Sequence, residues 1–187
     1  MRFLLYILLT FLLVQSVAVL GQESSTPASK AVDVGFPFEE FVETAKTEFA
    51  KSFILNIEQK NPSVAALFAQ RPDVRAAATN AGAAEFAKQY RLITIPAAKS
   101  AVTFIYARTF TVVELERMFE HHSKWGGAPD AEYNKTPLGQ KEIGLSNQVA
   151  SAMMAASQAS LPEMMPSVMV KIQSAIQSTL AHSGPKK

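Results

Sequence analysis

The sequence predicts an all-α protein, an irregular antiparallel bundle of about six to eight helices. Three observations favour this class. Apolar residues recur at helical spacing along most of the chain, and prolines and glycines divide it into pieces of helix length. The most strand-like run, VTFIY at residues 102 to 106, has no visible partner strand, so it too is expected to be helical.

Residues 1 to 21 have the pattern of a secretory signal peptide. Arg2 is their only charged residue, an apolar run extends from Phe3 to Val14, and small residues close the segment at Gly21. We expect cleavage before Gln22 and a periplasmic or secreted protein. The alternative is an uncleaved membrane anchor, because the apolar stretch is about long enough to span a bilayer.

The rest of the chain divides into a lead-in, one domain and a tail. Residues 22 to 35 are polar and turn-rich, which predicts a flexible lead-in. Residues 36 to 183 suit a single helical domain, and residues 184 to 187 form a solvated tail. Because the chain has no cysteine, packing alone must stabilise it. A net charge of +2 gives no basic surface typical of nucleic-acid binding.

The first predicted helix begins near Pro37, since proline suits a first turn and Glu39 and Glu40 suit the positive end of the helix dipole. Its apolar stripe consists of Phe38, Phe41, Val42, Ala45, Phe49, Phe53 and Ile57. Asn61-Pro62 ends this helix and starts a short one that reaches about Gln70.

Proline also organises the middle of the chain. Arg71-Pro72-Asp73 starts an alanine-rich helix that runs to about Thr94. Pro96 is expected to kink or break this element, because proline lacks a backbone N–H.

The clearest local signal is a capping box, in which Thr111 and Glu114 cap each other's backbone N–H groups. The helix that follows is expected to run to about Lys124 and to end at the glycines after Trp125. Residues 126 to 136 predict a loop.

Two helical stripes fill the last third of the chain, and Pro162 is expected to separate them. The first stripe consists of Leu145, Val149, Ala152, Met153, Ala156 and Ala159. The second consists of Met165, Val168, Met169, Ile172, Ile176 and Leu180.

Two segments, FTVVELERMF at 110 to 119 and TPLGQKEIG at 136 to 144, together resemble the bacterial domain-of-unknown-function family numbered 2059. Its members carry "F-[ST]-x-x-E-L", an aromatic stretch and "S-P-x-G-x-K". The matching residues are Phe110, Thr111, Glu114, Leu115, Pro137, Gly139 and Lys141, with Thr136 in place of serine. The chain departs from the family where KWGGAPDAEYNK intervenes and where His121-His122 stands in place of Phe-Tyr. The resemblance implies an exported all-α fold and no particular reaction, ligand or partner.

The second segment also has a physical interpretation of its own. Thr136 can cap a helix, Pro137 can be its first residue, and Gly139 permits close approach of a neighbour. The segment is therefore either a capped helix start or, with Lys141, a weak site for an anion or a partner carboxylate.

Metal sites are not predicted. Adjacent helical side chains point about 100° apart, so His121 and His122 cannot chelate one ion together. One is expected to pack at the bundle edge and the other to lie in water, and His182 is expected to be exposed. The seven methionines suggest Cu(I) as an alternative, but Met165 and Met169 lie on the apolar stripe, which favours core packing.

No catalytic residue, cofactor site or metal ligand is predicted. The chain lacks a G-x-S-x-G elbow, a phosphate-binding glycine motif and any Glu-x-x-His pair. We predict a non-catalytic binding or scaffolding module whose partner is a protein or an apolar small molecule. The alternatives are a lipid- or apolar-ligand-binding bundle, marked by a cavity of several hundred Å³, and a soft-metal carrier.

Overall fold

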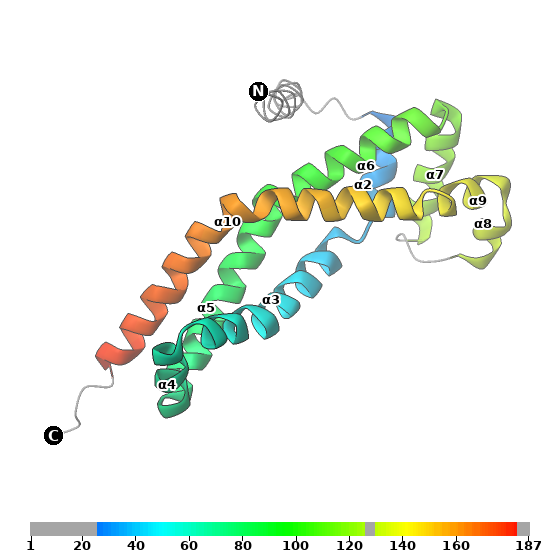
Figure 1. The fold of residues 1–187 in the computed structure, drawn as a ribbon. Coiled ribbons are helices and arrows are strands. Elements are labelled where there is room, and N and C mark those ends of the chain that lie inside the picture. The colour runs from blue at the N-terminus through cyan, green and yellow to red at the C-terminus, as the bar shows by residue number, and fades with distance from the viewer. Residues whose placement is uncertain (1–25, 126–129, 183–187) are drawn as a thin grey trace, which may run out of the picture.

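The computed structural model describes residues 26 to 125 and 130 to 182, and within these ranges every regular element is a helix. The all-α class is confirmed. The molecule is elongated, and its last helix, α10 (Ser146–His182), runs along most of its length (Figure 1). None of the helices described combines the length and apolarity needed to cross a membrane. The predicted leader (1 to 21) and tail (184 to 187) lie outside the described residues.

The predicted flexible lead-in is wrong over residues 27 to 35, which form helix α2 (Pro27–Gly35). The Thr26 hydroxyl accepts a hydrogen bond from the Ser29 N–H and caps this helix, with Pro27 in the first turn. Although the segment is polar in overall composition, Ala28, Ala31 and Val32 recur at helical spacing and form an apolar face. All three are buried. Residues 22 to 25 lie outside the described part of the chain.

The next helices begin and end where the proline signals place them. Helix α3 (Phe38–Lys60) ends before Asn61, α4 (Pro62–Gln70) ends before Arg71, and α5 (Pro72–Gln89) follows. Proline occupies the first helical position of α4 and α5, where its missing N–H costs nothing.

Pro96 does not break the helix, although the helix changes direction around residues 90 to 95 (Figure 1). A π-helical turn, η1 (Tyr90–Thr94), joins α5 to α6 (Ile95–Thr109), and the backbone N–H of Ile95 donates to the carbonyl of Tyr90, five residues earlier. The wider turn lies just before Pro96, which has no N–H to donate to a helical hydrogen bond. The helical backbone therefore continues from α5 into α6. The strand-like run 102 to 106 lies within α6, as predicted.

The capping box is confirmed at the start of α7 (Val112–Trp125). The Glu114 carboxylate accepts from the Thr111 N–H at 2.7 Å, and the Thr111 hydroxyl accepts from the Glu114 N–H at 3.3 Å. The loop predicted for 126 to 136 is wrong in part, because Asp130 caps a short helix, α8 (Ala131–Lys135). Helix α9 (Pro137–Ile143) follows directly.

The break predicted at Pro162 is also wrong, since α10 contains both Pro162 and Pro166. The helix bends part-way along its length (Figure 1), as prolines commonly cause. Its buried face on both sides of the prolines holds it against α5 and α6. This face consists of Val149, Ser160, Met164, Val168 and Ile172, so tertiary packing compensates for the lost backbone hydrogen bonds.

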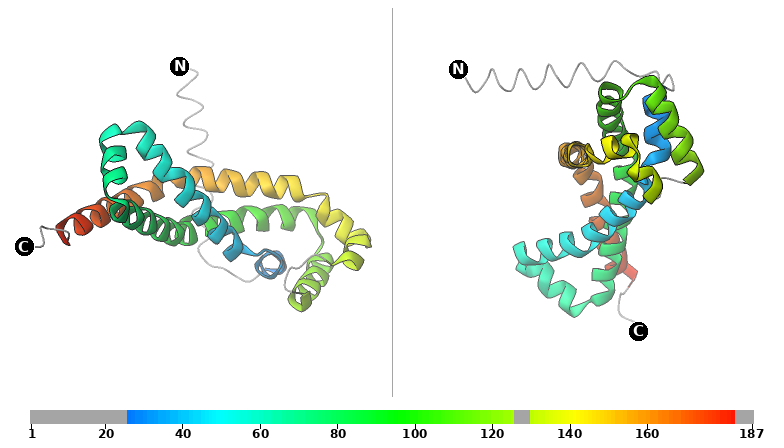
Figure 2. Two further views of the ribbon diagram at one scale, coloured as in Figure 1. Left: turned by 90° about the horizontal axis from the view of Figure 1, so that it is seen from below. Right: turned by 90° about the vertical axis from the view of Figure 1, so that its right-hand side faces the viewer.

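Two hydrophobic clusters stabilise the molecule, and α10 contributes to both. The first gathers α2, α6, α7 and the start of α10 around the fully buried Val32, Val102 and Met118. The second gathers α3, α4, α5 and the later part of α10 around Val74, Ala78 and Met164. Figure 2 shows α4 and the α7–α9 segment at opposite ends of the molecule, with the long helices between them.

Candidate functional site

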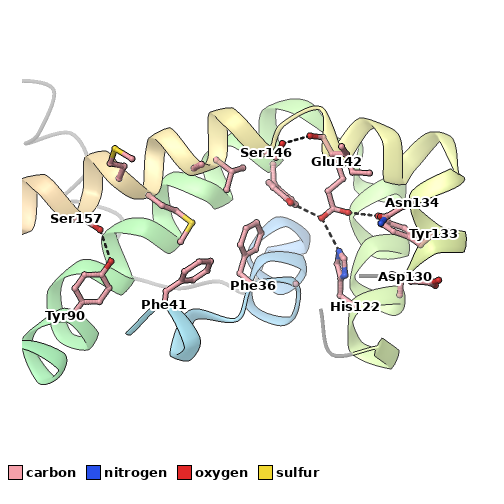
Figure 3. Close-up of a pocket in the computed structure, with 18 residues that line it drawn as sticks. Phe36, Phe41, Tyr90, His122, Asp130, Tyr133, Asn134, Glu142, Ser146 and Ser157 are labelled. Atoms are coloured by element: carbon pink, nitrogen blue, oxygen red, sulfur yellow. Dashed lines mark hydrogen bonds and ion pairs between the residues drawn. The ribbon is translucent and has the colours of Figure 1, made fainter. Parts of the chain in front are cut away.

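A groove of about 590 Å³ lies between the α2–α3 junction and α10, and it is open to solvent along one side. Its middle is lined by aromatic and aliphatic side chains, and polar groups gather at its two ends (Figure 3). The apolar walls include Phe36, Phe41, Val149, Met153 and Met154. A pocket of this size and lining suits a small, largely apolar molecule.

Glu142 organises one end of the groove. Its Oε1 accepts hydrogen bonds from the Tyr106 hydroxyl at 2.9 Å and from Nε2 of His122 at 3.1 Å, and its Oε2 accepts from the Tyr133 hydroxyl at 2.8 Å. These partners come from α6, α7 and α8, while Glu142 itself lies on α9. Glu142 therefore joins four helices at a single carboxylate.

The surroundings keep Glu142 ionised at neutral pH. Burial raises its pKa, but the hydrogen bond and charge of His122 and the two tyrosine hydroxyls outweigh burial, so the pKa lies below its ordinary value. Burial together with the Glu142 charge raises the pKa of Tyr106 and Tyr133 far above the usual tyrosine range. Both phenols therefore stay protonated and donate to the carboxylate.

The two histidines flank this cluster, and neither lies free in water. His122 is buried and packs against the backbone of Gly35, where an added Cβ would approach the ring to 3.0 Å. His121 stacks on Tyr133 with ring centroids 3.9 Å apart, and its Nε2 lies 3.7 Å from the Asp130 carboxylate. The expectation of one solvated histidine was wrong, because the ring of Tyr133 on α8 covers His121, and no local pattern predicts that contact.

Tyr90 and Ser157 mark the other end of the groove, where their hydroxyls lie 2.8 Å apart (Figure 3). Tyr90 is the first residue of η1, so the π-helical turn sets the rotation at which this ring meets α10. Isolated π-helical turns are rare and occur often at functional sites.

The structure brings the predicted residues Thr136, Pro137 and Gly139 together as a capped helix start. The Thr136 hydroxyl accepts from the Gly139 N–H at 3.0 Å, and Pro137 is the first residue of α9. The backbone of Tyr133 lies so close to Gly139 that a Cβ there would collide with its carbonyl oxygen. The predicted close approach at this glycine is confirmed, and the neighbour is α8.

Lys141 already has an anionic partner within the chain. Its ammonium lies 2.9 Å from both carboxylate oxygens of Glu114 and also covers the ring of Phe110. The hydrogen bond from Lys141 is the main cause that lowers the pKa of Glu114 to about 2. Binding of an external anion or partner carboxylate at this segment stays a prediction, and such a ligand must compete with Glu114.

The same segment lines a second, more polar hollow of about 740 Å³ on the other side of His121 and Tyr133. Charges of both signs surround it, from Glu114, Glu120, Arg117, Lys124 and Lys141. This mixed lining favours no single charge of ligand, so the hollow is a weaker candidate than the groove.

The methionines differ in burial, and they lie in the core, at its edge or at the groove wall. Met164 is fully buried and accepts a hydrogen bond from the Thr94 hydroxyl at 3.2 Å, whereas Met165 and Met169 are only partly buried. Met154 is 62% exposed at the groove wall.

Among the described residues, no three histidine, aspartate or glutamate side chains gather as a metal site would require. His182 is exposed, as predicted.

Comparisons with known proteins place this chain in no family. No family model matches it, and neither the curated proteins nor the solved structures include a match. The resemblance to family 2059 therefore stays a prediction.

The sequence analysis missed Glu142, the centre of the groove's polar end. Its hydrogen-bond partners lie 9 to 36 positions away along the chain, so no local sequence motif predicts these contacts. In the sequence, Tyr106 ends the strand-like run and Tyr133 lies in the predicted loop, and neither position indicates a shared acceptor. The one available signal was that Glu142 follows directly after the segment Thr136 to Lys141.

Proposed function

We propose that this protein is a non-catalytic binding module that holds an elongated, largely apolar small molecule in the groove beneath α10. The observation that carries this proposal is the groove itself, with its aromatic and aliphatic walls and its polar groups confined to the two ends. Its volume of about 590 Å³ lies within the usual range for small-molecule sites.

The hydroxyl groups of the groove support binding rather than nucleophilic catalysis. Ser146 donates to the backbone carbonyl of Ile143, and Ser157 shares its hydrogen bond with Tyr90. Neither serine is hydrogen-bonded to a histidine, lysine or carboxylate that could act as its general base. The acidic group, Glu142, is held by three donors that orient it as a fixed recognition element.

The location that accompanies this function is the periplasm or the outside of the cell. The support is the pattern of residues 1 to 21, with one basic residue, an apolar run and a small-residue end. N-terminal sequencing of the protein purified from its native envelope tests this proposal. A mature chain that begins at Gln22 is expected, and a chain that begins at Met1 in the membrane fraction contradicts it.

Binding can be tested with N-phenyl-1-naphthylamine, a neutral apolar dye whose fluorescence rises in apolar sites. Ala150→Trp places a large ring in the groove from an exposed position on α10. Because the position is exposed, the substitution should lower the free energy of unfolding only slightly. Ala155→Trp makes the same change at an exposed position of the same helix outside the groove lining. Circular dichroism and melting curves confirm that each variant folds.

We expect saturable dye binding by the wild type and by Ala155→Trp, and binding at least about tenfold weaker by Ala150→Trp. Equal binding by the two variants would place the dye elsewhere and contradict the groove. A linear fluorescence rise without saturation in the wild type would contradict the binding function.

A further inference from the structure

The groove carries two carboxylates, and the basic side chains among its described lining residues are two histidines, His121 and His122. Glu142 and Asp130 lie at the same end (Figure 3), and none of the described lining residues is a lysine or arginine. Nδ1 of His122 is buried without a hydrogen-bond partner, so an added proton there would leave a charged N–H unsatisfied. His122 donates from Nε2 to Glu142, which stays ionised at neutral pH.

Glu142 retains the capacity to accept one more hydrogen bond. A carboxylate offers about four acceptor positions. Tyr106 and His122 occupy those of Oε1, and Tyr133 occupies one of Oε2. The Glu142 side chain is 18% exposed, so a ligand can reach it. An ammonium group gains most at such a place, because hydrogen bonds between charged groups are about twice as strong as neutral ones.

The aromatic rings of the groove reinforce this preference. Tyr133, stacked on His121, stands beside the carboxylate, and Phe36 and Phe41 follow along the apolar wall (Figure 3). Aromatic faces attract cations within about 6 Å and repel anions. An anionic amphiphile such as a fatty acid would meet two carboxylates here, with no lysine or arginine among the described lining residues.

We propose that the ligand of this groove is an apolar molecule with a protonated amine, seated with its ammonium against Glu142 and its apolar body along Phe36 and Phe41. This inference rests on the proposed binding function and names the chemical class of the ligand. Asp130, at the mouth of the same end, adds longer-range attraction for the cation.

Three eight-carbon probes with different head groups test the inference: octylammonium, octan-1-ol and octanoate. Each is titrated at pH 7 into the full protein, by calorimetry and by displacement of the neutral dye. We expect octylammonium to bind about tenfold more tightly than octanol, and octanoate to bind more weakly than octanol. Octanoate binding as tight as octylammonium binding overturns the inference and leaves the binding function standing. Failure of all three probes and of the dye to bind overturns both.

Substitutions locate the preference. Glu142→Gln keeps the shape of the side chain and is expected to lower octylammonium affinity to about that of octanol. Glu163→Gln removes the same charge from an exposed site on α10 outside the groove and is expected to change neither. Asp130→Asn is expected to weaken octylammonium alone by about threefold, and it serves if Glu142→Gln fails to fold. If the variants at Glu142 and Asp130 that fold still bind octylammonium more tightly than octanol to the same degree as the wild type, the assignment of the ammonium site to this end of the groove is overturned.

Discussion

Removal of the charge on Glu142 should destabilise the protein at neutral pH but not in acid. In Glu142→Gln the amide oxygen can replace Oε1 and keep the bonds from Tyr106 and His122, while the amide N–H₂ turns the Tyr133 hydroxyl into an acceptor. All three charge-assisted bonds become neutral, at a cost of roughly 0.5 to 1 kcal/mol each. We expect the free energy of unfolding to fall by about 2 kcal/mol at pH 7, which leaves a typical domain folded.

The pH dependence follows from the lowered pKa of Glu142. A carboxyl group whose folded-state pKa is lowered stabilises the protein above its unfolded-state pKa, about 4.3 for glutamate, and loses this contribution as the pH falls through the folded-state value. The difference between wild type and Glu142→Gln should therefore be full above about pH 5.5 and shrink steadily as the pH falls below 4.3.

Urea unfolding followed by circular dichroism at a series of pH values measures this difference. Glu163→Gln is the matched control, because its side chain is exposed, and it should stay within about 0.5 kcal/mol of the wild type. A Glu142→Gln deficit that stays constant from pH 7 to pH 3.5 would refute the electrostatic reasoning and leave only a packing effect.

Two further predictions pair a substitution with its control. Gly139→Ala should destabilise the protein by about 1 to 3 kcal/mol, because its Cβ collides with the Tyr133 backbone, whereas Gly144→Ala at the C-terminal cap of the same helix meets only ordinary contacts of 3.4 Å or more and should be neutral or slightly stabilising. Urea unfolding of both variants checks this, and equal stabilities would contradict the close contact. Met164→Ala should cost about 2 to 5 kcal/mol, because Met164 is fully buried, whereas Met154→Ala, at a 62% exposed position, should change the melting temperature little and instead weaken dye binding. Similar losses of stability in the two methionine variants would argue against the buried position of Met164.

Local signals in the sequence were enough to place many helix boundaries. Asn61-Pro62, Arg71-Pro72 and the Thr111–Glu114 box act within one helical turn, so their effect does not depend on the rest of the fold. The errors arose where tertiary contacts decide. Pro162 lies inside α10 because the buried face around it packs on α5 and α6, which a local argument cannot weigh.

The candidate site was much less predictable than the fold class. The segment singled out in advance, Thr136 to Lys141, has the predicted local geometry, yet the groove depends on Glu142, the next residue. Its importance comes from Tyr106 and His122, which reach it only after α6, α7 and α9 have assembled. A single sequence carries no trace of such long-range contacts.

The position of α10 at the end of the chain constrains when the protein can fold. Val149 completes the first hydrophobic cluster, and Met164, Val168 and Ile172 complete the second. The contacts of α10 with both clusters can therefore form only after this last segment of the chain has been synthesised. Such late completion suits the proposed export, because a chain that passes through a membrane channel as an unfolded thread must not close its core early.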